Sequence, residues 1–384
     1  MDEKKWKQTT ALIALLAIAG CAAPQSLQLS SLSSLSSLSP SSLSALKAVT
    51  RSQEFNVTRT VKAENWAKIE CLSNLDPSFP DEQARPNGRQ TDPEIVEGFG
   101  TQTPPSRDVL LHYGKGWEKG RGTPVLLVHG TLVDANSSWV KPHGKSGLAP
   151  ALFEKGLRVF AVTLAHRHGD NLLQAENIKN AIERIKEVTG AKEVDVVAHS
   201  KGTVASRALA SGLKKSWASA YRKDIRRLVL IAGPHLGMDY TFRHPAVNWG
   251  LYPEKAQSIL NAPMSWTKTL FMGLWIDTSA QTLYSGHGDY FPGQSQLLYR
   301  WDKTYPLPMD GPDWYTSYHG GQGLVSYCPG IDQAIKDGGN FIDTLRKNPL
   351  DSKVQLAVLA GDNPNLSTIL NETSGPSDGV AFVK

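Results

Sequence analysis

From residue 121 onward, short apolar runs alternate with amphipathic stretches, and this alternation is the strongest constraint on the fold. The apolar runs have the length and composition of buried strands, and they occupy residues 125–128, 158–163, 194–198, 227–232 and 354–360. Residues 171–189 carry apolar side chains three or four residues apart and end at Gly190, which predicts an amphipathic helix. A second helix with small side chains is expected over 203–213. Strands that alternate with helices predict an α/β fold with a mostly parallel sheet flanked by helices.

The segment Ala198-His199-Ser200-Lys201-Gly202 lies between the third predicted strand and the helix that follows it. A tight turn in this position holds a serine in a strained conformation with its hydroxyl exposed, which is the nucleophile elbow. The residues two before and two after the serine must be small because the backbone folds back on itself, and Ala198 and Gly202 meet that need. We therefore predict Ser200 as a catalytic nucleophile. The alternative is a structural serine at the N-cap of a helix.

Three further segments follow predicted strands: His129-Gly130-Thr131, Ile231-Ala232-Gly233-Pro234-His235-Leu236-Gly237 and Gly375-Pro376-Ser377-Asp378-Gly379-Val380. Together with the serine turn, they resemble the bacterial lipase and esterase branch of the α/β-hydrolases. The resemblance covers residues 121–240 well and 354–384 in part. It implies the α/β-hydrolase fold, with residues 241–350 as a lid-like or cap-like insertion that shapes the substrate pocket.

The same resemblance implies roles for individual residues. The backbone N–H groups of Thr131 and Lys201 would form an oxyanion hole, in which one donor lowers the barrier by roughly 3 kcal/mol. Asp378 would orient the catalytic histidine, although an Asp-Gly turn without a catalytic role is the alternative. His129 is expected to hold its loop by hydrogen bonds, and His235 is expected to pack near the site without being the base.

The catalytic histidine is the missing member of the predicted site. In this fold the nucleophile, the acid and the histidine follow one another along the chain, but no histidine follows Asp378. We therefore expect the reading frame to continue beyond Lys384, with the histidine in that continuation. The alternative places the base at His319, with an earlier acid such as Asp289 as its partner.

The first 20 residues have the features of a secretory signal peptide. Lys4, Lys5 and Lys7 precede a short apolar run that ends at Cys21. The sequence Ile18-Ala19-Gly20-Cys21 resembles the lipobox of bacterial lipoproteins, which implies cleavage before Cys21 and lipidation of that residue. The protein would then be anchored in the cell envelope, most simply at the outer membrane, and a plain signal peptide on a secreted protein is the alternative.

The remaining sequence divides into three predicted parts. Residues 21–49 include a Ser/Leu-rich stretch and are predicted to form a tether. Residues 50–120 are rich in Pro, Gly, Asn and Asp and are expected to form a loop-rich N-terminal extension that packs on the hydrolase domain. That domain is expected to span residues 121–384.

Charge and cysteine content exclude several classes of function. The formal net charge is +5, but the basic residues are scattered, so a nucleic-acid partner is not expected. The sequence contains no Cys-x-x-Cys motif, and its His and Cys residues form no cluster with zinc-ligand spacing. We therefore expect neither a metal nor a cofactor. With Cys21 acylated and the chain exported, Cys71 and Cys328 would be the remaining thiols in an oxidising compartment, which predicts a disulfide between them.

These features predict a carboxylic ester hydrolase that acts on a lipid or another ester through an acyl-enzyme on Ser200. Two alternatives stay open. The same site can cleave amides or polyesters, because fold and triad do not specify the leaving group. The fold can also serve as a non-catalytic binding scaffold in an envelope lipoprotein.

Overall fold

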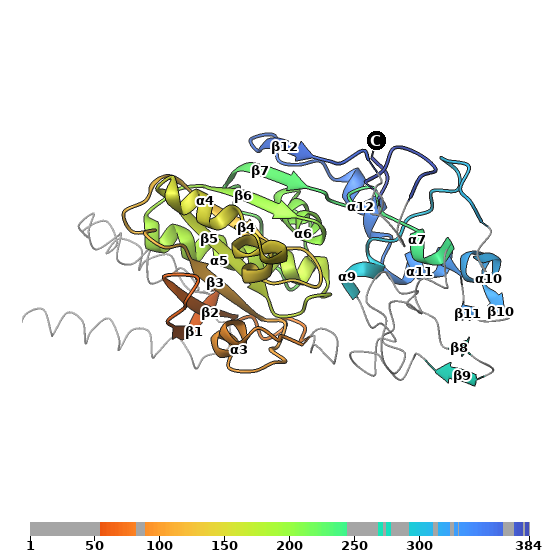
Figure 1. Ribbon diagram of the computed structural model, residues 1–384, viewed down its shortest axis with the longest axis horizontal. Helices are drawn as coiled ribbons and strands as arrows, with labels where there is room; N and C mark the ends of the chain where they lie inside the picture. Colours follow the sequence, from red (N-terminus) through yellow and green to blue (C-terminus); the bar gives the residue numbers. More distant parts are fainter. Residues whose placement is uncertain are drawn as a thin grey trace, which may run out of the picture. The chain divides into compact units, whose positions relative to one another are not determined.

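The structure is a computed structural model that describes residues 54–81, 89–243, 268–271, 274–277, 292–309, 314–322, 326–328, 330–363, 372–378 and 381–383 (Figure 1). The described residues all belong to one compact unit, Glu54–Lys384. The predicted signal peptide, Cys21 and the Ser/Leu-rich tether fall outside the described residues.

An eight-stranded sheet forms the centre of this unit, in the order β1-β2-β3-β5-β4-β6-β7-β12. The strands are β1 (Phe55–Val61), β2 (Lys68–Asn74), β3 (Asp108–Tyr113), β4 (Arg121–Val128), β5 (Leu157–Leu164), β6 (Val194–His199), β7 (Ile225–Ile231) and β12 (Gln355–Leu359). The last five of these are parallel to one another, whereas β1, β2 and β3 pair antiparallel and join the sheet through β5. The parallel part contains all five strands expected from the apolar runs, which confirms the mostly parallel α/β sheet.

Helices cover the sheet, and two of them lie where residues 171–189 and 203–213 predicted helices. The main helices are α3 (Pro93–Phe99), α4 (Leu148–Glu154), α5 (Asn171–Thr189) and α6 (Lys201–Ala210), with short turns η2 (Asn136–Val140) and η3 (Pro142–Gly144). The Asp170 carboxylate caps α5 by accepting hydrogen bonds from the N–H groups of Leu172 and Leu173, and Gly190 ends the helix at φ 69°. Helix α6 begins two residues earlier than expected, because the chain turns into the helix directly after Ser200.

The core lies on both faces of the parallel strands. Leu126 and Val128 of β4 pack in one apolar cluster with Ile178 of α5 and Val204 of α6. The intervening Leu127 belongs to a second cluster on the opposite face, since successive side chains of a strand point to opposite faces. Both faces are buried, and this is why the central strands appear in the sequence as continuous apolar runs rather than as alternating patterns.

The segment expected to be a loop-rich extension, residues 50–120, differs from that expectation. It contributes β1, β2, β3 and α3, so it is part of the main sheet rather than a layer packed on it. Strand β1 lies at the sheet edge and carries mostly exposed polar side chains. Edge strands of this kind lack the apolar pattern by which a strand is recognised, and the intervening Pro- and Gly-containing turns dominated the local composition.

Glu70 on β2 is a buried carboxylate that ties this antiparallel part to α5. Its side chain is 3% exposed and accepts hydrogen bonds from Arg184 Nε at 2.8 Å, Lys68 Nζ at 2.6 Å and the Tyr113 hydroxyl at 2.6 Å. Burial alone would raise the pKa of this carboxyl, but the hydrogen bonds from these partners outweigh it and lower the pKa to about 2. Glu70 is therefore ionised at neutral pH and stabilises the contact between β2 and α5.

The expected disulfide between Cys71 and Cys328 is wrong. Cys71 is a free cysteine, buried on β2 among apolar side chains of the second core cluster. Burial raises the pKa of its thiol to about 12. Cys328 belongs to β11 (Ser326–Cys328), a strand of a separate four-stranded sheet. The expectation rested on the oxidising compartment alone, and a compartment does not determine whether two cysteine side chains are close enough to bond.

The described parts of residues 241–350 form a second small assembly of helices and strands. It contains α7 (Tyr240–Arg243), β8 (Lys268–Phe271), β9 (Leu274–Asp277), α9 (Pro292–Ser295), α10 (Trp314–His319), β10 (Gly321–Gln322), β11, α11 (Ile331–Asp337) and α12 (Phe341–Lys347). The small sheet has the order β10-β11-β8-β9. Phe242, Tyr318 and Ile331 share a small apolar core of their own. None of the helices within the described ranges is long and apolar enough to cross a membrane.

Candidate active site

Ser200 occupies the turn between β6 and α6 in a strained backbone conformation, with φ 51° and ψ −131°. Its N–H donates to the carbonyl of Ile231 at 2.9 Å, and its carbonyl accepts from the N–H of Thr203 at 3.0 Å and from the Thr203 hydroxyl at 2.6 Å. A non-glycine residue persists in such a conformation only where its surroundings fix it, and such residues cluster at functional sites. The turn has the backbone geometry of a nucleophile elbow.

Two glycines allow the loop after β4 to lie directly against this turn. A Cβ atom placed on Gly202 would be 2.1 Å from the carbonyl oxygen of His129. A Cβ atom on Gly130 would be 2.7 Å from Ser200 Cβ and 3.2 Å from Ser200 Oγ. The structure thus brings Ser200 together with the His129-Gly130-Thr131 segment, as the resemblance implied, and it does so by backbone contacts that only glycine permits.

His129 fixes the orientation of the peptide between Gly130 and Thr131. Its Nε2 accepts a hydrogen bond from the N–H of Leu164 at 3.0 Å, so Nδ1 carries the proton and donates to the carbonyl of Gly130 at 2.7 Å. Burial lowers the pKa of His129 to about 4, which keeps the ring neutral. Because the C=O and N–H of a trans peptide point in opposite directions, the N–H of Thr131 points away from His129.

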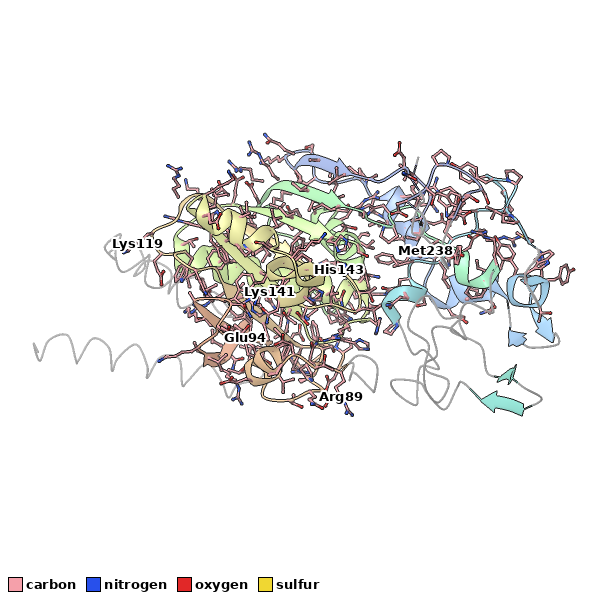
Figure 2. All side chains as sticks on the ribbon, viewed as in Figure 1. Arg89, Glu94, Lys119, Lys141, His143 and Met238 are labelled. Atoms are coloured by element: carbon pink, nitrogen blue, oxygen red, sulfur yellow. The ribbon has the colours of Figure 1, made fainter. Side chains whose placement is uncertain are left out.

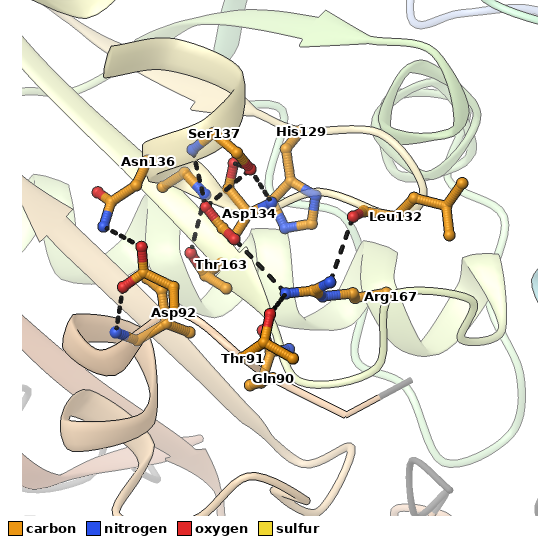
Figure 3. A network of polar contacts seen from close by, with 12 residues as sticks. Gln90, Thr91, Asp92, His129, Leu132, Asp134, Asn136, Ser137, Thr163 and Arg167 are labelled. Atoms are coloured by element: carbon orange, nitrogen blue, oxygen red, sulfur yellow. Dashed lines mark hydrogen bonds and ion pairs between the residues drawn. The ribbon is translucent and has the colours of Figure 1, made fainter. Parts of the chain in front are cut away.

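A network of polar contacts holds the loop beyond Thr131 (Figure 3). Arg167 donates to the carbonyl of Leu132 and to the hydroxyl of Thr91, both at 3.3 Å, and forms an ion pair with Asp134 at 3.6 Å. Gln90 donates to the carbonyls of Leu164 and Ala165 at 3.0 and 2.9 Å. The N-terminal segment around residues 90–92 therefore braces the two loops that follow β4 and β5.

A buried polar cluster beside Thr131 was not predicted. The Thr131 hydroxyl lies 2.9 Å from His168 Nδ1 and 2.7 Å from Gln294 Nε2, and Lys201 Nζ donates to Gln174 Oε1 at 2.5 Å. Lys201, His168, Gln174 and Gln294 are all buried. Burial lowers the pKa of His168 well below its usual range, so the ring is neutral.

A sequence signal existed for part of this cluster. His166-Arg167-His168 follows a predicted parallel strand, and the ends of parallel strands that carry functional side chains meet at one edge of the sheet. Gln294 had no such signal, because it lies in the insertion, far along the chain from Thr131.

Asp378 lies near the end of β12. A Cβ atom on Gly361 would be 3.4 Å from Asp378 Cβ, and the carboxylate accepts a hydrogen bond from the N–H of Ala381 at 2.8 Å. Asp378 and His235 line the same cavity of about 400 Å³, whose other walls are mainly apolar side chains of β7, β12 and the 381–383 segment. Ser200 is not among the residues that line it.

His235 is half-buried in this cavity, and neither of its ring nitrogens has a hydrogen-bond partner among the described residues. Burial lowers its pKa to about 3. Its Nε2 lies close to Gly233, where an added Cβ atom would be 2.6 Å from it and 2.1 Å from the Thr203 hydroxyl. His235 therefore packs near the first turn of α6, as expected.

The alternative base, His319, is exposed at the end of α10, where its ring contacts the rings of Trp314, Tyr315 and Tyr318. Asp289 lies outside the described residues. Within the described ranges, no group of three or more His, Cys, Asp or Glu side chains is placed to hold a metal ion. Figure 2 shows the side chains of the described residues on the ribbon.

Comparisons with known proteins give one family match over part of the chain and solved structures of low overall similarity. A family described as "Domain of unknown function (DUF7379)" matches residues 100–244. A comparison with curated proteins gives no match.

Three solved structures illustrate the similarity. A candidate lipase from Sulfolobus solfataricus is 17% identical with a TM-score of 0.28, and the alignment covers 47% of this chain and 50% of that one. The mature lipase BlEst2 of Bacillus licheniformis is 13% identical with a TM-score of 0.37 and coverages of 68% and 77%. A mutant epoxide hydrolase of Bacillus megaterium is 19% identical with a TM-score of 0.26 and coverages of 39% and 55%.

The chain thus spans about half the length of the Sulfolobus protein that it matches. The fold itself is evident from this chain alone. A mostly parallel sheet flanked by helices, with a strained serine between the β6 strand and the α6 helix, is the α/β-hydrolase fold.

Proposed function

We propose that this chain is a serine hydrolase that cleaves carboxylic esters through an acyl-enzyme on Ser200. The observation that carries the proposal is the strained conformation of Ser200, at φ 51° and ψ −131°, with Gly130 packed against its side chain. A binding scaffold would gain nothing from a strained serine in this position, whereas a nucleophile gains exposure of its hydroxyl.

In the proposed reaction, Ser200 Oγ attacks the acyl carbonyl while a histidine takes its proton. The C–O bond to the alcohol then breaks, the histidine returns the proton to the leaving oxygen, and water hydrolyses the acyl-enzyme by the same steps. Asp378 is the proposed acid that orients the histidine. Among the histidines of this sequence, His319 is the alternative base, and its substitution tests that role.

The proposed oxyanion hole consists of the backbone N–H groups of Thr131 and Lys201. Two anchored carbonyls support this role: the carbonyl of Gly130 is held by His129, and that of Ser200 is held by Thr203. In each peptide the N–H points opposite to the anchored carbonyl. Both donors therefore have a fixed direction before substrate binds, which is the condition under which such donors lower a barrier.

Labelling with a fluorophosphonate tests the proposal, because the reagent modifies an activated serine and releases its leaving group without needing the natural substrate. We expect labelling of the wild type and none of Ser200→Ala, together with loss of ester hydrolysis. Removing a triad serine lowers turnover by roughly a million-fold. A variant that kept even about a tenth of wild-type hydrolysis would exclude Ser200 as the nucleophile.

A panel of esters from short to long acyl chains, with an amide of the same acid, would then separate esterase, lipase and amidase activity. We further propose that Cys21 is lipidated and anchors the enzyme at the cell envelope, with residues 21–49 as the tether. The lipobox-like sequence before Cys21 supports this placement.

A further inference from the structure

Residues 292–299 of the insertion, which we call the strap, are bonded to the loops that follow two strands of the main sheet, β5 and β7. The N–H of Gly293 donates to the carbonyl of His168 at 2.9 Å, beyond the end of β5. The carbonyl of Leu297 accepts from the N–H of Met238 at 2.9 Å, and the N–H of Tyr299 donates back to Met238 at 3.1 Å, beyond the end of β7. The strap is therefore fixed by backbone hydrogen bonds on both sides.

The strap also lies in close contact with Lys201, whose N–H is one of the proposed oxyanion donors. A Cβ atom on Gly293 would be 2.0 Å from the carbonyl oxygen of Gly169 and 2.6 Å from Lys201 Nζ. Only glycine fits at this point. The side chain of Lys201 is thus covered by the strap on one side and bonded to Gln174.

Gln294 is the side chain by which the strap reaches the other proposed donor, Thr131. It is 2% exposed, and its Nε2 lies 2.7 Å from the Thr131 hydroxyl and 2.5 Å from His168 Nδ1. The Thr131 hydroxyl itself donates to the carbonyl of Arg167 at 3.2 Å. Gln294, His168 and Arg167 together hold Thr131 from three directions, and Gln294 alone comes from the insertion.

We propose that Gln294 is a positioning residue of the oxyanion hole. It acts through the Thr131 side chain, fixing the residue whose backbone N–H faces the developing negative charge. The insertion, which is expected to shape the substrate pocket, thereby takes part in setting the geometry of the catalytic loop. This inference rests on the proposed function.

The test compares Gln294→Leu with Gln296→Leu. Gln296 is another buried glutamine of the strap, 8% exposed, but it bonds to Asp170 and Asn171 rather than to Thr131. For each variant, kcat and KM are measured with a p-nitrophenyl ester. The inhibition constant of a trifluoromethyl ketone with the same acyl chain is measured alongside, because this ketone forms a tetrahedral oxyanion on the serine.

We expect Gln294→Leu to lower kcat about tenfold and to weaken binding of the ketone about tenfold, with KM nearly unchanged. This loss is smaller than the roughly hundredfold or greater loss in kcat that follows deletion of an oxyanion donor. Gln296→Leu is expected to lower Tm comparably while kcat and the ketone constant stay within about twofold. If Gln294→Leu keeps kcat within about twofold, or if both variants lose kcat in proportion to Tm, the inference is overturned.

Thr131→Val provides a second approach should Gln294→Leu fail to fold, since it removes the hydroxyl and keeps the backbone donor. It is expected to cause the same loss in kcat. Where Gln294→Leu does fold, the kcat of the double variant is expected to be no lower than that of either single variant. Full additivity would overturn the inference. The results for these variants bear on the role of Gln294 and not on the proposed function. The proposed function itself would be overturned by a wild-type protein that neither hydrolyses esters nor is labelled at Ser200.

Discussion

Replacing Gly130 with alanine places one methyl group between the loop after β4 and the nucleophile. The new Cβ atom would lie 2.7 Å from Ser200 Cβ and 3.2 Å from Ser200 Oγ. Carbon atoms in contact prefer about 3.5–4.0 Å, so the loop and the turn must separate by about 1 Å. A displacement of about 1 Å at a catalytic centre can cost on the order of a hundredfold in rate. We expect Gly130→Ala to lower kcat/KM by that factor and stability by about 1–3 kcal/mol.

The assay pairs ester hydrolysis with the rate of fluorophosphonate labelling and a thermal melt. Gly98→Ala is the matched control, because its Cβ atom would lie 2.8 Å from Leu110 Cδ1 in the buried contact between α3 and β3, away from Ser200. This control is expected to affect Tm without affecting kcat/KM. The reasoning is refuted if Gly130→Ala retains more than about a third of wild-type kcat/KM, or if Gly98→Ala loses as much.

Other predictions follow from the fold and from the sequence. The pKa of Glu70 is about 2 when folded, below its ordinary 4.5, so its stabilisation is present above pH 4.5 and is lost as pH falls toward 2. Urea unfolding should therefore show a cost for Glu70→Gln on the order of 3 kcal/mol at pH 6 that shrinks toward pH 2, and a pH-independent cost would contradict it. Cys71 should resist iodoacetamide in the native protein and react after unfolding, because it is a buried thiol with a pKa of about 12; rapid native labelling would argue against this packing. Fatty-acid labelling in a Gram-negative host should be present in the wild type and absent in Cys21→Ser, and equal release of both as soluble protein would count against a lipid anchor. His319→Ala should keep kcat/KM within about twofold, since this exposed ring packs on the exposed Tyr315 of its own helix; a loss of about a hundredfold would assign the base to His319.

The sequence by itself determined the parallel half of the sheet and the position of Ser200. Mostly apolar runs such as 125–128 and 194–198 became β4 and β6 because their apolar side chains pack in the core clusters on the two faces of the sheet. The small residues Ala198 and Gly202 indicated a turn too tight for larger side chains, and Gly202 indeed lies against the His129 carbonyl. Backbone conformation and burial impose these requirements locally, so the local residue types predict them.

Only the tertiary structure decided the antiparallel half of the sheet and the environment of the oxyanion loop. Strand β1 is an exposed edge whose pairing depends on β2 rather than on its own pattern. Gln294 reaches Thr131 across 163 positions of sequence, and the free state of Cys71 follows from where β2 lies in the core. Contacts between segments that are distant in the sequence depend on how the secondary-structure elements pack together. A local pattern of residue types does not predict that packing.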